Sequence, residues 1–261
     1  MKAFNTPMTI TERHQLILHK LKEQGQVDIQ ELCDSMKVSG VTIRKDLKLL
    51  EDKHLLFRTR GGASIHNPYT SERPINEKEF INAEEKQKIA KAAVELIGQN
   101  DSIMIGSGTT VFEISRFLYP AKHLTVITPA VKVTLELSNR PNVEVLQLGG
   151  LIRPNSSSVA GSYAESILAA ISCGILFLGV DGIDLDFGFS ITNLAEATLN
   201  QKMIETAQVI AVLADSSKFG RRGLGKVCNI EQVQYVITDE GVRKDIVEQL
   251  EERGIKVIVA K

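Results

Sequence analysis

The sequence predicts two domains of different fold class: a small winged helix-turn-helix and a larger α/β domain with a mostly parallel sheet. Within residues 1–66, three short amphipathic helical patterns precede a short hairpin pattern. Within residues 86–261, short apolar runs alternate with helix-compatible stretches, which is typical of parallel strands buried on both faces. Residues 67–85 are polar, contain two prolines and lack apolar periodicity. We therefore expect a linker there.

The first domain is expected to contain three helices and a wing. The sequence Thr9-Ile-Thr-Glu12 has the spacing of a capping box and begins a helix that Gly25 ends. A second helix fits residues 29–37, and a third fits residues 39–53 with Ser39 as its N-cap. Residues 55–62 predict a short hairpin. This order of elements is that of a winged helix-turn-helix.

The second domain is expected to contain seven strands. Each is a short apolar run that contains β-branched residues or lies between helix-compatible stretches. The predicted strands are residues 102–105, 124–127, 143–148, 175–178, 209–213, 235–237 and 257–259. Alternation of strands with helices predicts crossover connections and hence a parallel sheet.

The charge distribution favours a DNA-facing first domain. The chain of 261 residues has a formal net charge of −1. Residues 1–66 hold 11 Lys and Arg against 8 Asp and Glu, and the remainder holds 20 against 24. The excess of positive charge in the first part is small, but its sign suits a nucleic-acid partner.

The composition argues against membrane, secreted and metal-dependent classes. No apolar run approaches the roughly 20 residues that span a bilayer, and residues 1–11 lack the pattern of a signal peptide. Cys33, Cys173 and Cys228 are far apart and form no C-x-x-C pair, which indicates buried free thiols. We expect a cytoplasmic protein without a metal or another cofactor.

The third helix carries the candidate DNA contacts. Ile43, Leu47 and Leu50 share one face of this helix. The opposite face therefore carries short side chains in the first turn and positively charged side chains in the turns that follow. Such a face suits entry into the major groove, where Arg or Lys donates to guanine and Thr contacts the thymine methyl group. A solvated charged surface is the alternative interpretation. The candidate contacts are Ser39, Val41, Thr42, Arg44, Lys45 and Lys48, with Arg58 and Arg60 from the hairpin.

Four loops after predicted strands carry candidate ligand contacts. Residues 106–110 (G-S-G-T-T) precede a helix and can form an anion cradle from backbone N–H groups and hydroxyls, although a tight turn alone also needs glycines. Residues 149–153 end in Arg153, residues 179–184 contain two carboxylates, and residues 214–218 end in Lys218. Loops at the carboxyl ends of parallel strands converge, so this set describes a phosphosugar site.

Residues 38–47 (V-S-G-V-T-I-R-K-D-L) and 58–63 (R-T-R-G-G-A) resemble the DNA-binding head of the DeoR/GlpR family of bacterial repressors. The family has Arg where this chain has Lys45, and His where it has Arg60. The four loops resemble the family's sensor domain, which is similar in fold to ribose-5-phosphate isomerase. This chain has Gly106 where the family usually has Asp, so its effector preference is expected to differ.

The resemblance implies a repressor of a sugar-catabolism operon that leaves operator DNA when a phosphorylated sugar binds. It also implies a homo-oligomer, either a dimer or a tetramer. The alternative is a sugar-phosphate isomerase with a regulatory head, in which Asp181 would be the base. Residues 186–190 lack the Lys of the isomerase loop, so we expect no catalytic residues. The expected effector-binding residues are Ser107, Gly108, Thr109, Thr110, Gly150, Arg153, Asp181, Asp184 and Lys218.

Overall fold

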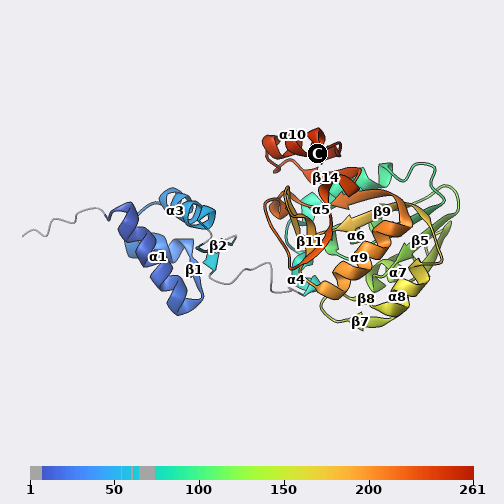
Figure 1. Cartoon of the computed structure of the whole chain (residues 1–261), viewed down its shortest axis with the longest axis horizontal. Coiled ribbons are helices and arrows are strands. Elements are labelled where there is room, and N and C mark those ends of the chain that lie inside the picture. Colours follow the sequence, from blue (N-terminus) through green and yellow to red (C-terminus); the bar gives the residue numbers. More distant parts are fainter. Residues whose placement is uncertain (1–7, 54, 60, 65–73) are drawn as a thin grey trace, which may run out of the picture. The chain divides into compact units, whose positions relative to one another are not determined.

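The computed structural model describes residues 8–53, 55–59, 61–64 and 74–261 (Figure 1). The chain divides into two compact units, Met1–Ser71 and Glu72–Lys261. Within the described residues, no helix has the length and apolar character needed to cross a membrane. The cysteines there are all free thiols; Cys173 and Cys228 are buried, whereas Cys33 is half-buried.

The first unit contains three helices and an antiparallel sheet. Its elements are α1 (Ile10–Gln24), β1 (Gln26–Asp28), α2 (Ile29–Met36), α3 (Gly40–Asp52), β2 (Phe57–Arg58) and β3 (Gly62–Ser64), with strand order β1-β3-β2. Both predicted N-caps are present: the Thr9 hydroxyl accepts the Glu12 N–H, and the Ser39 hydroxyl accepts the Thr42 N–H at 3.2 Å. Gly25 ends α1 in the left-handed region, with φ of 76°.

The winged helix-turn-helix fold is confirmed, with one strand that the sequence did not predict. Strand β1 has three residues, of which only Val27 is buried. A segment this short has no detectable alternation, and its conformation depends on pairing with β3. The core of the unit includes Ile17, Leu21, Leu32, Ile43, Leu47 and Leu50.

The second unit is built on a seven-stranded parallel sheet, as predicted. In spatial order the strands are β15 (Lys256–Ala260), β14 (Tyr235–Asp239), β12 (Ala207–Leu213), β9 (Cys173–Gly179), β4 (Ser102–Ile105), β5 (Leu124–Thr128) and β6 (Val143–Gln147). Every neighbouring pair is parallel. Each of the seven predicted apolar runs corresponds to one of these strands, and only Leu148, the last residue of the 143–148 run, lies beyond its strand.

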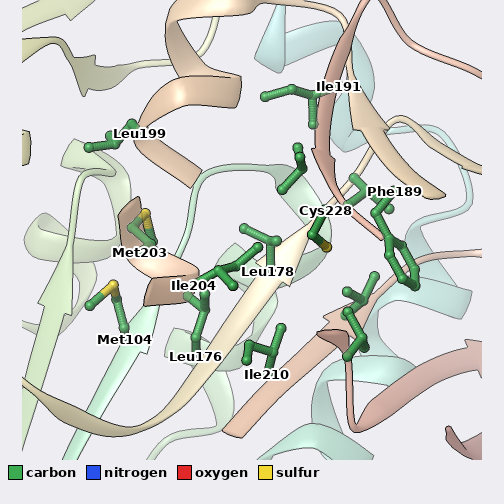
Figure 2. Close-up of a cluster of buried hydrophobic side chains, with 14 of the residues drawn as sticks. Met104, Leu176, Leu178, Phe189, Ile191, Leu199, Met203, Ile204, Ile210 and Cys228 are labelled. Atoms are coloured by element: carbon green, nitrogen blue, oxygen red, sulfur yellow. The ribbon is translucent and has the colours of Figure 1, made fainter. Parts of the chain in front are cut away.

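Helices cover both faces of this sheet (Figure 1). On β9, Leu176 and Leu178 pack in one core, and Ile175 and Phe177 in the other. Figure 2 shows part of the first core, where Met203 and Ile204 of α9 (Leu194–Thr206) approach the sheet. Besides α9, helices α8 (Ser162–Leu168) and α10 (Lys244–Glu252) contribute side chains to the first core. Helices α5 (Ala83–Glu95), α6 (Thr109–Phe117) and α7 (Val131–Leu137) contribute side chains to the second core.

Two smaller sheets extend the strand ends. One is the hairpin of β7 (Leu151–Arg153) and β8 (Ser158–Ala160), and the other contains β10 (Gly182–Asp184), β11 (Gly188–Ile191) and β13 (Gly225–Cys228). Both are antiparallel. They supply loops to the region beyond the carboxyl ends of the central strands.

The segment expected to be a linker differs from that expectation in its second half. Residues Ile75–Glu79 form helix α4, and α5 begins at Ala83, three residues before the predicted start of the domain. The Ile75 side chain is 7% exposed. A five-residue helix is too short to show apolar periodicity, and contacts with the rest of the unit stabilise it instead.

Candidate functional site

Helix α3 presents the predicted DNA-contacting face to solvent. Val41 is 62% exposed, and Arg44, Lys45 and Lys48 are exposed as well. Thr42 is half-buried, and its hydroxyl lies 3.0 Å from that of Ser39. The structure therefore brings the predicted residues of this helix to one side, with Ser39 as its cap.

The two predicted arginines of the hairpin have different outcomes. The Arg58 backbone N–H donates to Glu51 Oε1 at 2.8 Å, and its guanidinium Nη1 lies 3.7 Å from Glu51 Oε2. This pair ties the wing to the end of α3. Arg60 lies outside the described residues.

A pocket in the second unit collects six of the nine predicted effector-binding residues. Ser107 and Gly108 follow β4, Asp181 follows β9, and Lys218 follows β12. Helix α6 begins at Thr109 and has no side-chain cap, so the first N–H groups of this helix are available to an anion. The six predicted residues in the lining are Ser107, Gly108, Thr109, Thr110, Asp181 and Lys218.

Asp181 is an ionised hydrogen-bond acceptor at the pocket wall. Its Oδ2 accepts the Thr192 N–H at 3.0 Å and the Thr192 hydroxyl at 2.9 Å, and its Oδ1 accepts Lys78 Nζ at 3.0 Å. Burial alone would raise the pKa of Asp181, but the ammonium groups of Lys78 and Lys218 and these hydrogen bonds hold that pKa below its usual value. Asp181 is therefore a carboxylate suited to accept ligand hydroxyls.

A second carboxylate of the pocket, Asp215, interacts with Lys218 as well. It is 2% exposed and accepts hydrogen bonds from Asn82 Nδ2 at 2.9 Å and from the Ser217 N–H at 3.0 Å. Burial would raise its pKa, but Lys218 and the hydrogen bonds lower that pKa overall. Burial lowers the pKa of Lys218, although Asp181 and Asp215 oppose this effect.

Two lysines of the pocket were missed by sequence reasoning. Lys78 lies on α4, within the predicted linker, and Lys86 lies on α5. Lys86 is 4% exposed, and burial lowers its pKa to about 8; Asp215 opposes the shift and Lys218 adds to it. No motif surrounds either lysine, so the sequence offered no signal for their place in the site.

The pocket also contains an unsatisfied hydroxyl. The Ser156 Oγ atom is buried and has no hydrogen-bond partner among the residues that the structure describes, and Ser156 lines the pocket beside Asn155. A buried polar atom without a partner is costly. A polar ligand in the pocket would remove that cost.

The other three predicted residues do not line this pocket. Arg153 Nη1 pairs with Glu196 Oε1 at 2.9 Å, and Glu196 is a lining residue. Asp184 Oδ1 accepts the Phe187 N–H at 2.8 Å and pairs with Arg222, so Asp184 orders the turn between β10 and β11. Gly150 has φ of 142°, a conformation that favours glycine for backbone reasons.

Position 106 lies against the sheet. The Gly106 N–H donates to the Phe177 carbonyl at 2.9 Å, and a Cβ atom there would meet Leu178 Cδ1 at 3.3 Å. Among the described residues, no cluster of three or more His, Cys, Asp and Glu side chains is arranged to hold a metal ion.

The helix-turn-helix with its wing, together with an α/β unit whose pocket is lined by lysine, hydroxyl and carboxylate side chains, defines the class of ligand-sensing DNA-binding regulators. Residues 13–68 match the model of the DeoR-like helix-turn-helix domain, and residues 81–240 match that of the DeoR C terminal sensor domain. The chain belongs to the DeoR family, which confirms the resemblance found in the sequence. It is a DNA-binding transcriptional regulator and not an isomerase.

Two bacterial regulators match this chain over nearly their whole length, and a solved isomerase structure matches about half of it. The putative aga operon transcriptional repressor of Escherichia coli O157:H7 is 39% identical, over 95% of this chain and 93% of its own. An HTH-type regulator of Bacillus subtilis strain 168 is 35% identical, over 96% of each. Ribose-5-phosphate isomerase A of Methanocaldococcus jannaschii is 19% identical over 53% of this chain and 55% of its own, with a TM-score of 0.40.

Proposed function

We propose that this protein represses a sugar-utilisation operon and that a phosphorylated sugar, bound in the pocket, releases it from operator DNA. The observation that carries the proposal is the pocket, which is lined by Lys78, Lys86 and Lys218 together with the uncapped first residues of α6. Cations and helix N–H groups together suit a phosphate. The name of the Escherichia coli relative, a repressor of an operon, agrees with the sign of regulation.

We assign the parts of the ligand as follows. The loop from Ser107 to Thr110 and Lys218 hold the phosphate, and Asp181 accepts sugar hydroxyls. Arg153 acts on the pocket through Glu196. Gly150 and Asp184 shape the backbone around the site and do not contact the ligand.

We assign DNA contact to the exposed face of α3, with Val41, Thr42, Arg44 and Lys45 reading bases. Lys48, Arg58 and Arg60 bind phosphate groups of the DNA backbone. Residues 1–66 form the DNA-binding domain, and the α/β unit senses the effector and forms dimers or tetramers. Two heads then bind two half-sites about one helical turn apart, in the cytoplasm.

Fluorescence anisotropy of the full chain on labelled DNA from upstream of its own gene tests this proposal. Titration with a panel of pentose and hexose phosphates and inorganic phosphate should reveal one sugar phosphate that releases the DNA. Lys218→Met should weaken that release at least about tenfold, since a charge-assisted contact is lost. If the protein binds specific DNA and no compound of the panel alters that binding, the effector assignment is contradicted and the DNA-binding assignment is unaffected.

A further inference from the structure

Helix α4 is attached to its unit mainly by polar contacts. Of its five residues, only Ile75 is buried. The Ile75 N–H donates to the Asn155 carbonyl at 2.7 Å, and Lys78 Nζ donates to Asp181. Beyond the helix, Asn82 Nδ2 donates to Asp215. Because little apolar surface holds α4, these polar contacts decide how firmly it is seated.

The acceptors of these contacts are pocket residues. Asn155, Asp181 and Asp215 all line the pocket, as do Ile75 and Lys78 themselves. The attachment of α4 and the binding of a ligand therefore involve the same side chains. A second attachment lies outside the pocket lining: Lys132 of α7 pairs with Glu79 at 2.7 Å and donates to Asn76 at 3.0 Å.

The charges of the pocket favour an additional anion near Lys78. The pocket is lined by three lysines and three carboxylates. Arg153 pairs with one of the carboxylates, Glu196, so the three lysines are balanced by Asp181 and Asp215 alone. Among the described residues, Lys78 Nζ donates to Asp181 alone, so two of its three N–H bonds remain for a ligand. Lys78 and Asp181 side chains are 29% and 21% exposed, which keeps the pair accessible.

We propose that Lys78 is a direct ligand of the effector's anionic group, and that binding there tightens α4 onto the pocket and so passes the signal toward the DNA-binding unit. This inference rests on the proposed function. Lys86 is held on α5, which packs on the sheet, and Lys218 follows β12. Lys78 is the pocket cation on the element with the least apolar anchoring. Helix α4 is also the first described element after the first unit in the chain.

Hydrogen–deuterium exchange of the full chain tests the proposal, read on peptides from residues 75–82. The probes are inorganic phosphate and the pentose and hexose phosphates of the panel. The compound that releases DNA should slow exchange of these amides about fivefold or more. In Lys78→Met the compound should bind about tenfold more weakly, leave this exchange unchanged and fail to release DNA.

Two further variants separate a ligand role from a structural one. Lys132→Met removes the outer attachment and should speed the exchange of α4, while the compound still slows it. Lys78→Arg keeps the charge and should recover part of the slowing. Exchange in α5 and α9 should match the wild type in every variant, which shows that the unit is folded.

The outcomes distinguish this inference from the proposed function. A compound that releases DNA without changing the exchange of residues 75–82 overturns the role of α4 alone. The role of α4 is equally overturned if the compound slows exchange in Lys78→Met as it does in the wild type. If neither inorganic phosphate nor any sugar phosphate binds, the proposed function and this inference both fail.

Discussion

The guanidinium of Arg13 in α1 forms two hydrogen bonds with the carboxylate of Asp46 in α3. Nε lies 2.6 Å from Oδ2, and Nη2 lies 3.1 Å from Oδ1. The residues are 8% and 3% exposed, and His14 Nε2 lies 3.3 Å from the same carboxylate. Asp46 belongs to the buried side of α3, with Ile43, Leu47 and Leu50. The pair therefore fixes the recognition helix against the first helix.

Asp46→Asn should destabilise the DNA-binding domain without changing any of the side chains that contact DNA. The substitution leaves the Arg13 charge without its carboxylate, which costs about 2 kcal/mol for a buried charged hydrogen bond. Amide exchange in α1 and α3 of the full chain should report this loss of local stability. Arg243→Gln, at the exposed Arg243–Asp245 pair, should change nothing measurable. Equal protection in the wild type and Asp46→Asn would show that the bidentate pair is not a source of stability.

Arg44→Ala and Lys48→Ala should weaken DNA binding in different ways. Arg44 lies in the N-terminal half of α3, where side chains reach base edges, so its loss should cost about 1–3 kcal/mol on the operator only. Loss of Lys48 should weaken binding to all sequences and reduce the salt slope by about 1. Anisotropy on operator and scrambled DNA at several salt concentrations measures both effects. Identical losses on the two DNAs for Arg44→Ala would rule out base reading by this residue.

The sequence was sufficient to predict the central sheet, because its strands are buried on both faces. In the 175–178 run, alternate residues enter different cores, so all four are apolar. A continuous apolar run of this length between helical patterns has few other interpretations. The exposed face of α3 was predictable for a similar reason, since its three buried leucine and isoleucine positions fix the helix orientation.

The sequence was insufficient where a residue's partner is distant in the chain. Lys78 meets a carboxylate 103 residues later, and nothing local distinguishes it from a solvated lysine. Asp181 and Asp184 look equivalent in the 179–184 loop, yet only Asp181 lines the pocket. Asp184 lies in β10, opposite Gly188, and its carboxylate is used by the adjacent turn. Strand pairing, which the sequence does not show, separates their roles.

Gly62→Ala should disrupt the wing, whereas Gly61→Ala should be tolerated. A Cβ atom on Gly62 would lie 1.7 Å from the Val27 carbonyl oxygen, which is backbone and cannot move aside without breaking the β1–β3 pairing. A Cβ atom on Gly61 would have Asp28 Oδ2 as its nearest neighbour at 3.4 Å, which is an ordinary van der Waals contact. We expect Gly62→Ala to expose the β1 amides to exchange and to lower operator affinity at least about tenfold. Normal operator affinity in this variant would show that the wing takes no part in DNA binding.

Effector binding should have a pH optimum between about 6.5 and 8. Below it, a phosphate with a second pKa of about 6 loses its dianionic form. Above it, Lys86 loses its proton, because burial lowers its pKa to about 8. A bound dianion favours the charged lysine, so binding takes up a proton and affinity falls by up to tenfold per pH unit. Calorimetric titration from pH 5.5 to 9.5 measures this profile.

Lys86→Met should bind the effector more weakly near pH 7 and lose the alkaline decline in affinity, while the acidic decline remains. An alkaline decline that survives in Lys86→Met would mean that another group in the pocket is titrating.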